Sequence, residues 1–252
     1  MIREKILTLT LPVFICQSLS FGSYMKKIVI LSGAGISAES GLSTFRDSGG
    51  LWEGYDIMEV ATPEGWRKNQ SLVLEFYNMR RKAALEAFPN AGHKALVRLE
   101  AKYDVSIITQ NVDNLHEKAG SSHVMHLHGE LFKSRSTLDP RLIYDIKGWE
   151  LNEGDKCEKG SQLRPHIVWF GESVPMMDPA LEETMQADIF IVVGTSLQVY
   201  PAAGLLEYVS EEVPKYVIDP KMPDVRPRAN LHLIEEKGSV GLERLVGELM
   251  KA

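Results

Sequence analysis

Four groups of polar or glycine residues each follow an apolar run in this chain, and their types suit nucleotide chemistry. Gly33, Ala34, Gly35 and Ser37 follow residues 28–31, Gln110, Asn111 and Asp113 follow 105–109, His128 follows 124–127, and Gly194, Thr195 and Ser196 follow 189–193. If these runs are parallel strands, their carboxyl ends share one sheet edge and the groups can converge on one ligand. The alternative is that they are polar only because loops are polar. Groups that together contain Gly, Asn, Asp and His favour a site.

The glycine turn at residues 33–35 predicts where a nucleotide diphosphate binds. Glycines let the backbone bend tightly and approach a pyrophosphate, whose charge suits backbone amides and the start of the next helix. The third position of the dinucleotide fingerprint is Ala38, and no acidic residue clearly ends a second strand roughly 20 residues later. The motif is therefore an unusual variant, and we expect the residues that follow it, Phe45 and Arg46, to matter.

A histidine at the end of a predicted strand is the natural acid or base. His128 has that position, and an unperturbed imidazole titrates near neutral pH. If the strand continued, His126 and His128 would point to the same face, so a metal-binding pair is the alternative. We rank the metal pair lower, because no third ligand with suitable spacing follows.

Apolar runs alternate with helical patterns along the chain, and this alternation predicts the elements that position these residues. We expect strands at residues 28–31, 105–109, 124–127, 167–170, 189–193, 216–218 and 231–234, and helices at 63–66, 72–87, 92–102, 177–186, 202–210 and 240–250. Such a rhythm is typical of an α/β fold, with a parallel sheet covered by helices on both faces. Residues 43–55 are expected to form a loop, and residues 130–162 a small, irregular inserted module.

The predicted helix at 72–87 carries an apolar face and, beside it, a polar pair. The residues expected to be buried recur at helical spacing: Leu72, Phe76, Met79 and Ala83. Tyr77 and Arg80 are three residues apart and therefore lie side by side on the helix surface.

Charge and cysteine content narrow the function classes. With 28 basic and 34 acidic residues the net charge is −6. The chain therefore lacks the excess of positive charge that would predict a nucleic-acid partner. Two cysteines, Cys16 and Cys157, are too few for a disulfide framework or a four-thiolate metal site. A reducing, cytoplasmic setting is therefore expected.

Residues 1–24 are expected to be a dispensable N-terminal extension. A basic start followed by the apolar run 6–15 is the order of a secretory signal, which is the alternative interpretation. However, the run contains Pro12, no small-residue cleavage site follows it, and Met25 precedes the first strand directly. The run is also too short to span a membrane, so we expect no membrane partner.

Five blocks of sequence together resemble one protein family. GAGISAESG with TFRD, TQNVDNLH, HLHGEL, LRPHIVWFGE and GTSLQVYPA occur in this order and cover nearly all of residues 25–252. They resemble the sirtuins, which are NAD-dependent protein lysine deacylases. The resemblance implies a large Rossmann-like part, at about 25–48, 90–129 and 167–252, and a small part built from insertions at about 49–89 and 130–166. Acyl-lysine and NAD would enter a cleft between the two parts.

The resemblance also implies roles for individual residues. His128 would be the catalytic base, while Asn111 and Asp113 would orient the nicotinamide end and a ribose-bound water. NAD contacts are implied for Gly33, Ala34, Gly35, Ser37, Phe45, Arg46, Gln110, Asn111, Asp113, Gly194, Thr195 and Ser196, and by rough alignment at the adenosine end for Asp219, Gly238 and Val240. Aspartate stands at 219 where the family pattern suggests asparagine, and it can still accept hydrogen bonds from ribose hydroxyls.

The reaction implied by the family consumes NAD and transfers no hydride. The acyl oxygen attacks the ribose anomeric carbon as nicotinamide leaves, which gives an alkylimidate joined to ADP-ribose. His128 then deprotonates a ribose hydroxyl that attacks the imidate carbon, and water releases lysine and O-acyl-ADP-ribose.

Tyr77 and Arg80 specify which acyl group is expected. An arginine beside a phenol suits a carboxylate, whereas burying an unpaired guanidinium in an acetyl pocket is costly. The blocks ATPEGW and LVLEFYNMRR resemble the class III branch of sirtuins, the desuccinylases and demalonylases, in which a small residue such as Ala61 leaves room for the acyl tail. Further substrate contacts are implied for Val168, Phe170 and Gly171. The alternative is an ordinary amphipathic helix, with the tyrosine half-buried and the arginine solvated.

The chain departs from most sirtuins at the site where four cysteines hold zinc. Only Cys157 lies in that region, and Ser136 stands where a cysteine would align, so we expect no bound metal. The module would then be held by packing of its apolar residues, and it would be more mobile unless that core compensates. The residues expected to form this packing are Leu138, Leu142, Ile143, Tyr144, Trp149 and Leu151.

The sequence therefore predicts an NAD-dependent protein lysine deacylase with a preference for succinyl and malonyl groups. Its expected partners are acylated lysine side chains of other proteins, and we expect it to be a monomer. Two alternatives stay open: a plain deacetylase or ADP-ribosyltransferase, and a non-catalytic NAD or ADP-ribose sensor, which the missing zinc ligands make plausible.

Overall fold

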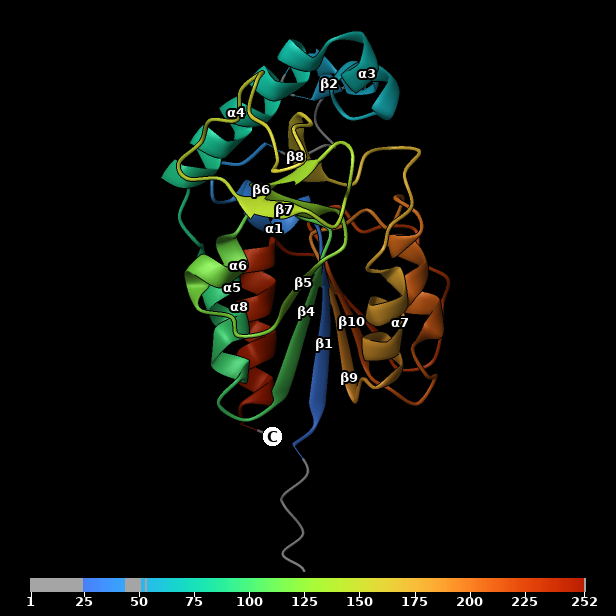
Figure 1. Cartoon of the computed structure of the whole chain (residues 1–252). Coiled ribbons are helices and arrows are strands. Elements are labelled where there is room, and N and C mark those ends of the chain that lie inside the picture. Colours follow the sequence, from blue (N-terminus) through green and yellow to red (C-terminus); the bar gives the residue numbers. More distant parts are fainter. Residues whose placement is uncertain (1–24, 44–50, 53, 252) are drawn as a thin grey trace, which may run out of the picture.

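A parallel β-sheet forms the centre of the molecule (Figure 1). The computed structural model describes residues 25–43, 51–52 and 54–251. The sheet contains six strands in the order β11-β10-β9-β1-β4-β5, and every neighbouring pair is parallel. Their bounds are β1 (Lys27–Ser32), β4 (Asp104–Thr109), β5 (Val124–His126), β9 (Ile189–Val193), β10 (Lys215–Ile218) and β11 (Leu231–Ile234). The predicted α/β fold with a parallel sheet is confirmed.

The central strand β1 shows why the sheet forms from uninterrupted apolar runs. Ile28 and Ile30 pack in a core on one face of the sheet, and Val29 and Leu31 pack in a second core on the other. A strand that is buried on both faces needs apolar residues at every position, so its sequence does not alternate with polar ones.

Helices cover both faces, as predicted (Figure 1). On one face lie α5 (Ala91–Leu99) and α8 (Gly238–Leu249), and on the other lie α7 (Met177–Met185) and a 3₁₀ helix, η2 (Ala202–Tyr208). An α-helix predicted at 202–210 is thus a shorter 3₁₀ helix, with Gly204 inside it. Two short helices are the next elements after β1 and β4: α1 (Ala34–Ala38) begins two residues after β1, and α6 (Leu115–Ala119) follows β4 after the loop 110–114.

A smaller part of the molecule sits over the carboxyl edge of the sheet (Figure 1). It contains the hairpin β2 (Leu51–Trp52) and β3 (Tyr55–Asp56), the helices α2 (Ile57–Val60), α3 (Pro63–Lys68) and α4 (Gln70–Glu86), and an antiparallel sheet of β6 (Gly129–Ser136), β7 (Ile143–Asp145) and β8 (Leu163–Ile167) in the order β7-β6-β8. A third core joins these elements through Phe76 and Tyr77 of α4, Leu131 of β6, and Ile167 and Trp169.

Several local predictions in this part were wrong, for identifiable reasons. Residues 130–162 are irregular only in part, because they include most of β6 and all of β7. β6 was missed because two of its buried positions are occupied by Ser134 and Ser136 rather than by apolar residues. The strand predicted at 167–170 instead ends at Ile167, where it pairs with Gly129. Beyond it, Val168 donates its N–H to the His128 carbonyl (2.9 Å) and Phe170 to the Ala61 carbonyl (3.0 Å).

The buried face of α4 is also rotated relative to the prediction. Met79 and Ala83 are exposed, whereas Val73, Leu74 and Ala84 are buried. The helix packs against β6 and β8 on one side and against the aromatic residues of the hairpin on another, so its buried face is wider than a single stripe.

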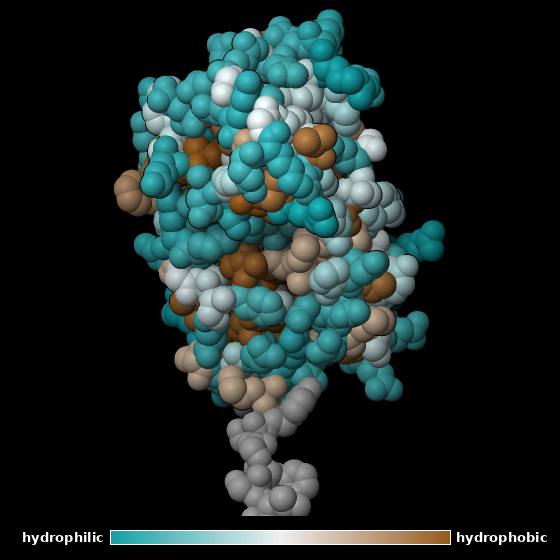
Figure 2. Space-filling view, viewed as in Figure 1, coloured by the Kyte–Doolittle hydropathy of each residue, from teal (hydrophilic) through white to brown (hydrophobic). Residues whose placement is uncertain are grey.

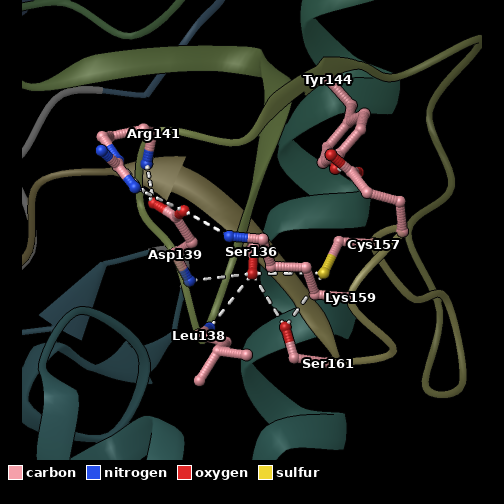
Figure 3. Close-up of polar contacts among 9 residues, drawn as sticks. Ser136, Leu138, Asp139, Arg141, Tyr144, Cys157, Lys159 and Ser161 are labelled. Atoms are coloured by element: carbon pink, nitrogen blue, oxygen red, sulfur yellow. Dashed lines mark hydrogen bonds and ion pairs between the residues drawn. The ribbon is translucent and has the colours of Figure 1, made fainter.

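The far end of the small part, at residues 136–161, is held mainly by polar contacts (Figure 3). The apolar packing predicted there was wrong for most of its residues. Leu138 and Ile143 are 66% and 44% exposed, Trp149 is exposed as well, Leu142 and Tyr144 are half-buried, and only Leu151 is buried. Instead, the hydroxyl of Ser136 accepts hydrogen bonds from the backbone N–H groups of Leu138 and Asp139, both at 3.1 Å.

Ser136 also connects the two chain segments that meet in this polar cluster. Its Oγ lies 2.8 Å from the Ser161 Oγ and 3.3 Å from the Cys157 Sγ. Beside it, the Asp139 carboxylate pairs with Arg141 at 3.0 Å and with Lys159 at 2.9 Å (Figure 3). One thiol beside two hydroxyls is not the donor set that a structural zinc ion prefers.

The visible face of the molecule is covered mostly by hydrophilic residues, with small hydrophobic areas between them (Figure 2). Across the described ranges 25–43, 51–52 and 54–251, no helix combines the length and the apolar content that a membrane crossing requires.

Candidate active site

A cavity of about 260 Å³ lies at the carboxyl edge of the parallel sheet, beneath the small part. Beside β1 the strand order reverses, because the chain proceeds from β1 through β4 to β5 on one side and from β9 through β10 to β11 on the other. Open α/β sheets bind ligands at this reversal. The cavity is lined by most of the predicted site residues: Gly33, Ala34, Gly35, Ser37, Ala61, Tyr77, Arg80, Gln110, Asn111, Asp113, His128, Val168, Phe170, Gly171, Gly194, Thr195 and Ser196.

The glycine turn after β1 is joined to the loop after β9, and its contact with a nucleotide diphosphate stays a prediction. Gly33 donates its N–H to the Val193 carbonyl (3.0 Å), and Gly35 donates to the Gly194 carbonyl (2.8 Å). A Cβ atom on Gly35 would lie 2.7 Å from the Cα of Gly194, and Gly194 has a φ of +64°. The two amides therefore fix the β1 loop to the β9 loop, and glycine is required because the two backbones touch.

Asn111, Ser37 and Asp113 form a hydrogen-bond chain across the end of β4. The Asn111 side-chain amide donates to the Gly33 carbonyl and to the Ser37 Oγ, both at 3.1 Å. Ser37 Oγ donates to Asp113 Oδ2 at 3.1 Å, and the Leu115 N–H donates to Asp113 Oδ1 at 3.1 Å. Burial raises the pKa of Asp113, although both hydrogen bonds act against that rise.

Hydrogen bonds also fix the base candidate. His128 Nδ1 lies 3.0 Å from the Gln110 carbonyl oxygen, which can only accept, so Nδ1 carries the hydrogen and Nε2 keeps a lone pair. Burial lowers the pKa of His128, and the bond to Gln110 offsets only part of this effect. The imidazole is therefore neutral near pH 7, which is the form that can accept a proton.

His126 does not pair with His128. Its Nδ1 lies 2.8 Å from the Asn111 carbonyl, and its Nε2 lies 2.7 Å from the Glu117 carboxylate. Burial lowers the pKa of His126, but the hydrogen bond and charge of Glu117, with smaller contributions from the Asn111 carbonyl and Glu130, together exceed this effect and the net pKa is raised. Within the part of the chain that the structure describes, no three His, Cys, Asp or Glu side chains lie together as metal ligands.

The polar pair of α4 lies in the wall of the cavity. Tyr77 is fully buried and accepts a 3.0 Å hydrogen bond from the indole Nε1 of Trp169. The guanidinium of Arg80 stacks 4.0 Å above the Trp52 ring, and Arg80 lines the cavity. The alternative of a half-buried tyrosine beside a solvated arginine therefore does not describe this helix.

Some predicted contacts lie outside this cavity. Asp219 is buried at the end of β10 and accepts the Lys221 N–H at 2.9 Å, Gly238 packs against Val193 and Ile36, and Val240 is 54% exposed. None of these three lines the cavity, and their roles at the adenosine end stay predictions. Phe45 and Arg46 lie outside the described residues.

Sequence reasoning missed two aromatic residues of the cavity. Trp52 falls in the stretch predicted as a loop, and Trp169 falls in a block that was interpreted as a strand. The sequence gives no indication that either tryptophan lies near the Tyr-x-x-Arg pair, because only the fold brings Trp52 and Trp169 next to α4.

Comparisons with known proteins agree with one another. A model of the Sir2 family matches residues 33–201. A Bacteroides thetaiotaomicron protein described as an NAD-dependent protein deacylase is 52% identical over 233 residues, which cover 90% of this chain and 100% of the relative. A Helicobacter pylori J99 protein with the same description is 54% identical over 229 residues, covering 90% and 97%.

Solved structures with the same fold contain nucleotides. A Sir2 homologue in complex with NAD superposes with a TM-score of 0.81 at 39% identity and covers 90% of both chains. A mutant Sir2 homologue in complex with ADP ribose gives a TM-score of 0.82 at 38% identity, covering 90% of this chain and 93% of that one.

Proposed function

The chain belongs to the Sir2 family and is an NAD-dependent protein deacylase, and on that premise we propose that it preferentially removes succinyl and malonyl groups from protein lysine. The proposed products are deacylated lysine, nicotinamide and O-acyl-ADP-ribose.

One observation carries the acyl preference: a cation and a buried phenol lie in the same cavity as His128. Arg80 and Tyr77 both line it, on the small part's side, and His128 lines it on the sheet side. Guanidinium and hydroxyl groups donate hydrogen bonds, and an ionised carboxylate accepts them from both. A succinyl or malonyl tail ends in that carboxylate, whereas an acetyl group ends in a methyl group.

The remaining polar groups support the shared chemistry of the family. When bound, NAD supplies the electrophilic ribose carbon to which the acyl oxygen attaches. In our proposal His128 Nε2 accepts a proton from a ribose hydroxyl, since Nδ1 is committed to the Gln110 carbonyl. Asn111 and Asp113, which are fixed to the β1 loop through Ser37, position the nicotinamide end and a water.

Mass spectrometry of peptides tests this proposal. Succinyl-, malonyl- and acetyl-lysine peptides are incubated with NAD and with wild type, His128→Ala or Arg80→Met. We expect wild type to prefer the acidic acyl groups and His128→Ala to be inactive on all three. Loss of a hydrogen bond to a charged group predicts that Arg80→Met lowers kcat/KM on succinyl-lysine by about 10- to 100-fold and leaves acetyl-lysine turnover nearly unchanged.

Lys82→Met is the matched control for Arg80→Met, because it removes one cation from an exposed position of the same helix. It is expected to change neither activity. Equal turnover of succinyl and acetyl peptides that Arg80→Met does not alter would contradict the acyl preference and favour a plain deacetylase. NAD binding without nicotinamide release from any peptide would instead favour an NAD sensor.

A further inference from the structure

We propose that Trp169 is a positioning residue for acyl selection, because its indole N–H fixes the Tyr77 hydroxyl as a hydrogen-bond donor to the acyl tail. The inference rests on the proposed preference for acidic acyl groups and deepens it. It assigns the selection to a pair of buried side chains rather than to the charge of Arg80 alone.

The direction of the hydrogen bond between the two side chains is fixed by their chemistry. Trp169 Nε1 and Tyr77 Oη are 3.0 Å apart, and both side chains are buried, with 2% and 0% of their surface exposed. An indole nitrogen donates and does not accept, so the phenol oxygen is the acceptor. The single hydrogen of the phenol therefore remains for another partner, and among the described residues the structure gives it no acceptor.

An acidic acyl tail provides the acceptor that this hydrogen lacks. Tyr77 lines the cavity, and an ionised carboxylate accepts hydrogen bonds without donating any. Burial raises the pKa of Tyr77 to about 12, so the phenol keeps its hydrogen at neutral pH. Opposite an acetyl methyl group the same buried hydroxyl would have no partner, which is unfavourable.

The surrounding residues hold the indole in the orientation that this requires. The Trp169 backbone N–H donates to Glu172 Oε2 at 2.9 Å, and the Arg164 guanidinium lies 3.3 Å from the centre of the indole ring. Arg164 bonds to Glu172 at 2.7 and 3.0 Å, and Arg135 bonds to the same carboxylate at 3.1 Å. The ion pairs between Glu172 and the arginines of β6 and β8 therefore hold the backbone N–H of Trp169 and cover one face of its indole ring.

A role in simple packing would give a different pattern of mutant effects, and a double-mutant cycle separates the two. Trp169→Phe removes the N–H and keeps an aromatic ring, while Tyr77→Phe removes the hydroxyl. If Trp169 acts through that hydroxyl, its substitution has no further effect on acyl selection once the hydroxyl is absent. A packing role would persist in both backgrounds.

The experiment measures kcat and KM for succinyl- and acetyl-lysine peptides with saturating NAD, using wild type, Trp169→Phe, Tyr77→Phe and the double variant. We expect Trp169→Phe to lower the succinyl-to-acetyl ratio of kcat/KM by about three- to tenfold, chiefly through a higher KM for the succinyl peptide. In the Tyr77→Phe background we expect the ratio not to fall further.

Trp66→Phe is the control variant. The centre of the Trp66 ring lies 5.8 Å from that of Trp169, so Trp66 takes part in the same aromatic packing. The hydrogen bond to the Tyr77 hydroxyl, however, comes from Trp169 and not from Trp66. Its substitution is expected to leave the ratio unchanged. Should Trp169→Phe fold poorly in a thermal unfolding assay, the benzothienyl analogue of tryptophan at 169 keeps both rings, lacks the N–H and must give the same result.

The outcomes separate the inference from the proposed function. A wild-type enzyme without a preference for succinyl-lysine overturns both. A wild-type preference that survives Trp169→Phe, or that falls equally in the presence and absence of the Tyr77 hydroxyl, overturns the role of Trp169 and leaves the proposed function standing.

Discussion

A backbone carbonyl determines which nitrogen of His128, the proposed base, can accept a proton. Gln110, at the end of β4, accepts from Nδ1, and the lone pair on Nε2 is left for the substrate. The sequence predicted that His128 would be the base, but the tautomer depends on a contact between two strand ends, which no local pattern encodes.

The lowered pKa of His128 predicts the pH dependence of the reaction. Because burial disfavours the protonated imidazole, the base stays neutral at pH values below the ordinary 6.5. We therefore expect the acid limb of the pH profile of kcat/KM for the succinyl peptide to lie below pH 6.5. Steady-state rates from about pH 5 to about pH 8 measure it.

A substrate carboxylate titrates at about 4, below this range, so it stays mostly ionised across the profile. His123→Ala, at an exposed position, is the matched control and should leave the profile unchanged. An acid limb centred above 6.5 would mean that His128 is not the titrating base.

At the scale of elements, the far end of the small part depends on one serine. Ser136 Oγ accepts two backbone N–H groups and contacts Ser161 and Cys157. We expect Ser136→Ala to leave those two amides without an acceptor, at about 1–3 kcal/mol of local stability. Hydrogen exchange of the amides around Leu138 and Asp139 should become faster by about tenfold or more.

Thr137→Ala serves as the control, since it removes an exposed neighbouring hydroxyl that bonds only across the surface to Gln162. Its exchange rates should stay close to wild type. If dialysis of wild type against EDTA accelerated exchange in the same segment, a bound metal rather than the serine would be holding it.

The elements that the sequence predicted well are those with continuous apolar runs. β1, β4 and β9 are buried on both faces, so hydrophobicity alone identifies them. β6 and β8 were missed or misplaced because Ser134, Ser136 and Arg164 occupy buried positions. Their side chains bond to partners on neighbouring segments that no local pattern indicates. Polar residues in a core are invisible to a pattern based on hydrophobicity.

For the whole molecule, a buried pair of histidines predicts sensitivity to acid. The rings of His93 and His116 contact each other with their centres 4.9 Å apart and their planes inclined by 59°, and both side chains are almost completely buried. Burial lowers the pKa of His93 from 6.5 to about 4, against weaker opposing effects of Glu117 and Glu39, and it lowers the pKa of His116 well below 6.5. The unfolded chain therefore binds protons in a pH range where the folded protein does not.

Stability from the pair is complete above the unfolded pKa of 6.5 and is lost as pH falls toward about 4. For His93 alone the difference corresponds to roughly 3 kcal/mol. Urea unfolding from about pH 5 to about pH 7 should show a free energy that rises with pH.

His93→Leu is expected to make this rise less steep, and His123→Leu, at an exposed site, to leave it unchanged. His126 acts in the opposite direction, because its raised pKa adds stability that disappears as pH rises through that pKa. A free energy of unfolding that is flat or falls with pH over the range would contradict the prediction.

For the whole molecule, the sequence predicts the place of the site wherever a motif directly follows a strand. The amino-acid sequence alone places Gln110, Asn111 and His128 on one edge, since parallel strands align their carboxyl ends. It does not reveal the contact between Gly35 and Gly194, because that contact joins residues far apart in the chain and depends on how β1 and β9 pair.

The division of the cavity between two parts of the chain has a consequence for protein engineering. Tyr77, Arg80 and Trp169 belong to the small part's side of the cavity, whereas Asn111 and His128 are fixed by the ends of the parallel strands. The side chains proposed to contact the acyl tail are thus expected to be exchangeable without disturbing those proposed to act on the ribose. A library confined to the cavity-facing positions of α4 and its tryptophan neighbours would redirect the enzyme to new lysine modifications while its NAD chemistry is retained.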